Sequence, residues 1–129
     1  MNDPHITIGE QLREVGQLVR KSPAENAHKL REDMGNIRMK CENSDNGHLI
    51  FQSYFLKTML NDVWKNLAID VSYRIPFEDQ ELILRMVGKY LKILGDLTRN
   101  GQFEHCYTAY VEFLVEYREA IREIGGRVE

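Results

Sequence analysis

The sequence predicts an all-α fold, in which residues 1–129 form one domain, an antiparallel bundle of about five helices. Apolar residues recur at intervals of three and four in five stretches, as they do on a helix with one buried face. Short runs of turn-forming residues separate these stretches, so we expect consecutive helices to be antiparallel neighbours. The predicted helices span about residues 8–20, 23–41, 48–69, 77–94 and 102–124.

The first two helices have recognisable starts. Thr7 and Glu10 have the spacing of a capping box, in which each side chain satisfies a free backbone amide. Ser22 and Glu25 repeat that spacing, with Pro23 at the first helical position, where its missing N–H costs nothing. The apolar stripes that follow are Ile8, Leu12, Val15 and Val19, then Ala27, Leu30, Met34, Ile37 and Cys41.

The other three helices are set apart by breaks. The third has a wide apolar face, which predicts a central position with neighbours on two sides, and it ends before the break at 70–76. The fourth is expected to end at Gly95, because glycine is common just after a helix. The fifth has the most regular seam, with Cys106 alongside: Phe103, Tyr107, Tyr110, Leu114, Tyr117, Ile121 and Ile124.

Composition narrows the class of protein. The net charge of −3 provides no general attraction for nucleic acid or anionic membranes. No apolar run reaches the roughly 18 residues of a membrane span, and the first residues lack the basic and apolar regions of a secretory signal. Cys41 and Cys106 both fall on apolar helix faces, which favours buried, reduced thiols and a cytoplasmic location over a disulfide.

One segment resembles a metal-binding motif. Glu25 and His28 match the Glu-x-x-His element of di-iron bundle proteins, which need two such elements and two further carboxylates. Only one copy is present, and both residues lie opposite the apolar stripe of their helix. We therefore expect no metal and no cofactor.

The run from Arg99 to His105 is similar to the Arg-x(4–6)-His signature of HEPN ribonucleases. That resemblance implies an RNA-cleaving toxin, with the arginine stabilising a phosphorane and the histidine moving protons. Gly101 interrupts the helix that should carry both residues, which favours a connecting turn followed by a solvent-facing histidine. No other nucleophile–base pair or phosphate loop is visible, so a non-enzymatic protein is the preferred expectation.

Two further resemblances concern helix pairs. The segment from Leu94 to Tyr110 is similar to the helix junction of a tetratricopeptide repeat, which implies that the fourth and fifth helices pair directly. The segments 8–13 and 22–30 resemble the first two helices of Cro-type repressors, which implies a DNA-binding regulator. That family needs a turn after Leu30, whereas the helical stripe here continues.

Charged and aromatic residues supply the remaining candidates. Arg85, Lys89 and Lys92 form a basic row that is suited to an anion, or to ion pairs with the acidic side of the next helix. The preferred hypothesis is a protein–protein interaction module, expected to form a homodimer, because interface cores are rich in aromatic residues. The candidate interaction residues are Tyr107, Tyr110, Leu114 and Tyr117, followed by Phe51, Tyr54 and Phe55. The same side chains could instead fill the core of the monomer.

Overall fold

A computed structural model describes residues 4–67 and 77–128 of the chain. Within these residues it contains five α-helices and no strand, so the predicted all-α antiparallel bundle is confirmed. The predicted break at 70–76 lies outside the described residues. The helices are α1 (Pro4–Lys21), α2 (Pro23–Glu42), α3 (Gly47–Leu67), α5 (Phe77–Arg99) and α6 (Phe103–Val128).

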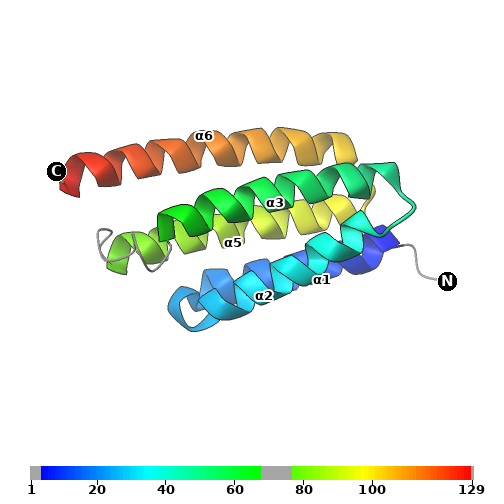
Figure 1. Ribbon diagram of the computed structural model, residues 1–129, viewed down its shortest axis with the longest axis horizontal. Helices are drawn as coiled ribbons and strands as arrows, with labels where there is room; N and C mark the ends of the chain where they lie inside the picture. Colours follow the sequence, from blue (N-terminus) through cyan, green and yellow to red (C-terminus); the bar gives the residue numbers. More distant parts are fainter. Residues whose placement is uncertain (1–3, 68–76, 129) are drawn as a thin grey trace.

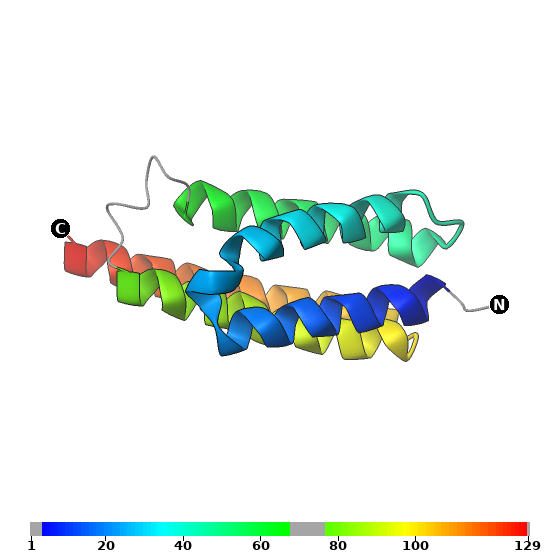
Figure 2. The ribbon, with the colours of Figure 1, turned by 90° about the horizontal axis from the view of Figure 1, so that it is seen from below.

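The helices form two layers, and α5 lies in the middle of one of them (Figure 1, Figure 2). In Figure 1, α1, α3 and α6 run in one direction, and α2 and α5 run in the other. Figure 2 shows α2 and α3 in one layer, with α1, α5 and α6 in the other. The backbone of α5 approaches α1 on one side and α6 on the other, and it also approaches α2. The central helix is therefore α5, whereas the sequence placed α3 at the centre.

The predicted apolar stripes form the core. Ile8, Leu12, Val15 and Val19 of α1 are all buried, and so are the four described side chains of the α2 stripe from Leu30 to Cys41. The direct pairing of the fourth and fifth predicted helices is also confirmed, because α5 and α6 lie side by side. The spacing of apolar residues along the chain thus identified the buried faces of α1 and α2.

The closest helix contact joins α1 to α5 through glycines on both sides. A Cβ on Gly95 would lie 2.5 Å from the backbone nitrogen of Arg13 and 2.6 Å from the carbonyl oxygen of Gly9. Seven residues away, two turns along each helix, a Cβ on Gly16 would lie 2.6 Å from the carbonyl oxygen of Gly88. The two backbones are therefore in direct contact, and no side chain larger than hydrogen fits between them.

The end predicted for the fourth helix is wrong. Gly95 lies inside α5, where it serves the contact with α1, and α5 continues to Arg99. The glycine that ends the helix is Gly101, which has a φ of 71°. Its N–H donates to the carbonyl of Thr98 (3.1 Å) and that of Gln102 to the carbonyl of Leu97 (2.8 Å), the two bonds of a Schellman motif.

The predicted capping boxes are not formed. The first helix begins at Pro4, a residue suited to an opening turn, so Thr7 lies inside the helix. Ser22 does occupy the N-cap of α2, before Pro23, but its side chain makes no capping hydrogen bond. Instead, the Asn26 side-chain amide donates to the carbonyls of Leu18 (3.0 Å) and Ser22 (2.9 Å), which ties the end of α1 to the start of α2.

The glycine contact predicts opposite effects for two similar substitutions. Gly95→Ala should lower the free energy of unfolding by about 1–3 kcal/mol, because its methyl group would force α1 and α5 apart. Gly35→Ala should raise it by about 0.5–1 kcal/mol, because nothing lies within 4 Å of that Cβ and alanine favours the helix. Urea unfolding measures both; equal effects would contradict the contact.

Candidate functional site

Aromatic rings fill the space between α3 and α6. The rings of Phe51 and Phe55 on α3 lie 5.4 and 5.3 Å from the ring of Tyr107 on α6, both edge to face. Phe55 also stacks on Tyr110, with 4.5 Å between the ring centroids. The two aromatic groups that the sequence suggested separately are therefore one cluster.

Tyr110 and Tyr117 lie in the core of the monomer, at the inner side of this cluster. The Tyr117 hydroxyl donates to the carbonyl of Asp62 on α3 (3.1 Å), and Tyr110 hydrogen-bonds to Thr58 of the same helix. Burial, with the nearby charge of Asp62, raises the pKa of Tyr110. These two candidate interaction residues attach α6 to α3 and have little surface left for another protein.

The outer side of the cluster is an apolar face open to solvent. The exposed fractions are 49% for Phe51 and 61% for Tyr54 on α3, and 58% for Val111 and 53% for Val115 on α6. Tyr107 and Leu114 are half-buried, and their spacing along α6 places them beside the valines. We call these six residues the α3–α6 face: Phe51, Tyr54, Tyr107, Val111, Leu114 and Val115.

Sequence reasoning missed three members of α6. Phe113, outside the predicted seam, is fully buried and contacts both Tyr90 and Tyr117. Val111 and Val115, not singled out from the sequence, are exposed. The buried seam of α6 is turned toward α5 relative to the prediction, because α6 covers two neighbours. The signal available in the sequence was a pair of valines four residues apart, each followed by a glutamate.

The residues of the candidate basic row make contacts with both neighbours of α5. The Arg85 guanidinium donates to the carbonyl of Arg20 at the end of α1 (2.8 Å). Lys89 lies 3.8 Å from the carboxylate of Glu116, as expected for ion pairing with the next helix. Lys92 lines a hollow beside Arg20 at the end of α1. Arg85 and Lys92 therefore both lie beside Arg20 of α1, whereas Lys89 faces Glu116 of α6.

The residues behind the two nucleic-acid resemblances lie at the junction of α5 with α6 and along α1 and α2. Arg99 lies 3.5 Å from the Glu10 carboxylate of α1, and His105 is exposed in the first turn of α6. The second helix runs without a break from Pro23 to Glu42, so the turn that a Cro-type repressor needs after Leu30 does not occur.

Glu25 and His28 are exposed on α2. In residues 4–67 and 77–128, no group of three or more His, Cys, Asp or Glu side chains has a geometry for holding a metal ion. Within those same ranges, no helix combines the length and the apolar character that crossing a bilayer requires.

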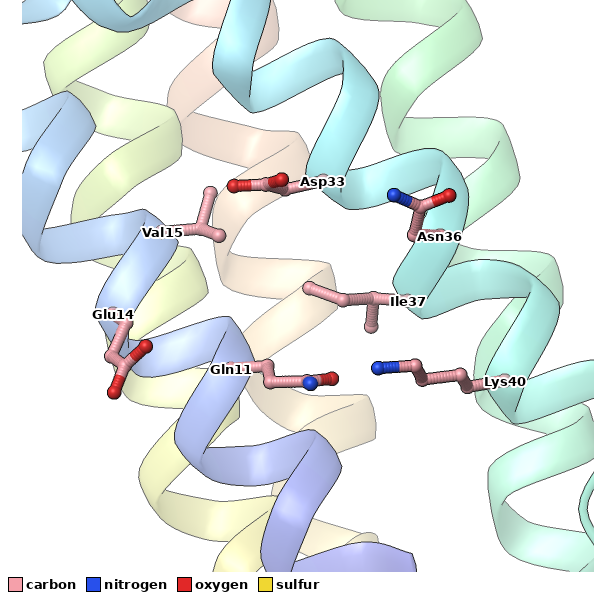
Figure 3. Close-up of a pocket in the computed structure, with 7 residues that line it drawn as sticks. All are labelled: Gln11, Glu14, Val15, Asp33, Asn36, Ile37 and Lys40. Atoms are coloured by element: carbon pink, nitrogen blue, oxygen red, sulfur yellow. The ribbon is translucent and has the colours of Figure 1, made fainter.

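A polar hollow of about 220 Å³ lies between α1 and α2. Figure 3 shows Gln11 of α1 and Lys40 of α2 extending toward each other across it. The buried side chains of Val15 and Ile37 also line it. Of its carboxylates, Asp33 is paired with Lys29 at 3.5 Å. The mixed charges of the walls do not define one class of ligand.

Comparison of the chain with models of protein families, with curated proteins and with solved structures found no match.

A chain of buried polar groups joins α3, α5 and α6. The Gln52 side-chain amide donates to the Thr98 hydroxyl (2.9 Å), which lies 3.6 Å from the Cys106 sulfur. All three side chains are buried, so each hydrogen bond is made away from water. These contacts fix the rotation of the three helices near one end of the bundle.

The hydrogen bond between Gln52 and Thr98 predicts that substitutions of these two residues have non-additive effects on stability. Thr98→Val should lower the free energy of unfolding by about 1–3 kcal/mol, because the buried Gln52 amide loses its acceptor. Adding Gln52→Leu should recover part of that loss, because no unpaired donor then remains. Urea unfolding of the four proteins of the cycle measures the coupling; additive effects would contradict the hydrogen bond.

The buried thiol of Cys41 predicts a loss of stability in alkali. Burial, with the charge of Glu42, raises its pKa from 9.0 to about 12. The folded state therefore favours the protonated thiol; this stabilisation is complete below pH 9.0 and lost as the pH rises toward 12. Between those limits the thiol contributes a slope of at most about 1.4 kcal/mol per pH unit.

The measurement compares wild type with Cys41→Ala by urea unfolding at about pH 8 and about pH 10.5. The variant should lose less stability between the two pH values, although Tyr90, whose pKa is also raised to about 12, gives both proteins a common slope. Equal losses in the two proteins would show that Cys41 ionises as freely in the folded chain as in the unfolded one.

Proposed function

We propose that this protein is a non-enzymatic protein–protein interaction module that self-associates through the α3–α6 face. The observation that carries the proposal is the grouping of Phe51, Tyr54, Val111 and Val115 on one surface, each about half exposed or more. Large exposed apolar patches on soluble domains mark interaction sites, and tyrosine and phenylalanine are enriched in interface cores. Burial of this face against another protein would remove it from water.

The rigidity of the face supports the same proposal. Phe51 is fixed by ring contacts to Phe55 and Tyr107, and Phe55 is stacked on the buried Tyr110. Aromatic side chains held in place before binding lose little conformational freedom when a partner arrives. The face therefore has the properties of a preformed contact surface.

The two thiols bear on where such an association would occur. Cys41 and Cys106 are free and buried, and burial raises the pKa of both. Free cysteines persist in reducing compartments, which supports the cytoplasm as the setting of the proposed association.

A matched pair of substitutions tests the proposal. Val115 and Met39 are equally exposed, at 53%, but Met39 lies on α2, across the bundle from α6 in Figure 1. Val115→Glu should weaken self-association by about 30-fold, because a charge on a buried interface costs about 2 kcal/mol. Met39→Glu should leave it unchanged.

Sedimentation equilibrium across a range of protein concentrations measures the dissociation constant. Circular dichroism confirms that both variants keep the helical fold, as expected for changes at exposed helix positions. A wild-type chain that stays monomeric at every concentration, or equal behaviour of the two variants, would overturn the proposal.

A further inference from the structure

The outer surface of α6 carries a second heptad stripe, distinct from the buried one. Its positions are separated by four, three, four, three and four residues, which is the spacing of a coiled-coil seam. All of them are exposed on the folded chain. The outer stripe consists of Glu104, Thr108, Val111, Val115, Arg118 and Arg122.

The order of charges along the outer stripe is asymmetric. The acidic residue Glu104 stands at its start, the two valines occupy its middle, and Arg118 and Arg122 stand at its end. A parallel, in-register pair of α6 helices would bring like charges together at both ends, which is unfavourable. An antiparallel pair would bring opposite charges together at both ends.

We infer that the occupant of the α3–α6 face is a second copy of this chain, with the two α6 helices antiparallel about a two-fold axis midway between Val111 and Val115. In this register Glu104 faces Arg122 of the second copy, Thr108 faces Arg118, and Val111 faces Val115. The inference rests on the proposed function and adds the occupant, the orientation and the register.

The two-fold arrangement is consistent with the rest of the face. A specific interface buries roughly 800 Å² on each partner, more than two valines supply. Tyr107 and Leu114 border the outer stripe on its α3 side, and Phe51 contacts Tyr107, so the apolar surface continues onto α3. In a two-fold contact, every pairwise contact between the two copies occurs twice, so each kind of contact contributes twice to the binding free energy.

A charge exchange tests the register. Glu104→Arg should raise the dimer dissociation constant at least about fivefold at low salt, because two attractive pairs become repulsive. Combining Glu104→Arg with Arg122→Glu should restore the wild-type value. Glu32→Arg, exposed on α2 and outside α6, is the control for net charge and should have little effect.

Cross-linking separates the two orientations. Thr108→Cys mixed with Arg118→Cys should give a covalent heterodimer with a short bis-maleimide, whereas Thr108→Cys alone should not. In the antiparallel register the two copies of residue 108 are ten residues apart, about 15 Å along the helix. The wild-type chain, whose cysteines are buried, serves as the background.

The results of these experiments distinguish the antiparallel register from self-association in general. Heterodimer formation with charge rescue supports the antiparallel register. Efficient cross-linking by Thr108→Cys alone, or a dimer indifferent to the charge exchange, overturns the register while self-association stands. A wild-type chain that remains monomeric overturns both the register and the proposed function.

Discussion

The contact between α1 and α5 determines how the rest of the bundle is arranged. Helices with ordinary side chains pack about 8–10 Å apart. Here Gly9 and Gly16 meet Gly95 and Gly88, and the backbones touch without side chains between them. Each interior glycine weakens its own helix by about 0.5–1 kcal/mol, so the four are explained by the packing that they permit. Ion pairs from Arg13 to Asp96 and from Arg99 to Glu10 border this contact and join the same two helices.

The opposite kind of packing occurs between α3 and α6, where large rings separate the helices. With α5 fixed against α1, its other side receives α6, and α3 meets α6 through Phe51, Phe55 and Tyr107. Rings of this size are covered on one side by their neighbours, and their outer edges remain in solvent. The exposed apolar face is therefore a consequence of how the bundle closes. Its polar anchors, such as the Tyr117 hydroxyl on the Asp62 carbonyl, lie on the inner side.

The sequence was sufficient for the helices and their inner faces because periodic burial leaves a direct record in residue spacing. It was ambiguous where one residue type serves two purposes. Gly95 is as compatible with a helix end as with a close helix contact, and only its heptad spacing from Gly88, matched by Gly9 and Gly16, distinguishes the two. The seam of α6 was identified only in part, for a related reason: Tyr110, Tyr117 and Ile124 are buried as predicted, but the buried Phe113 lies outside it. A helix with two neighbours has a wide apolar arc, and spacing alone does not show which part of the arc faces which neighbour. The aromatic cluster could not be predicted, because it joins helices about fifty residues apart in the chain.

In the outer stripe of α6, the residues that would supply affinity differ from those that would define the orientation of the partner. Exposed ion pairs contribute well under about 1 kcal/mol each, so Glu104, Arg118 and Arg122 cannot supply much affinity. Their order along the helix nevertheless distinguishes one orientation from the other, because reversing the second helix exchanges attraction for repulsion at both ends. Affinity in such a contact must come from the apolar surface, which α3 extends beyond the two valines. A face that was apolar alone would bind without a defined register, and a charged stripe alone would bind too weakly. The two are adjacent on this protein, which is what the proposed two-fold contact requires.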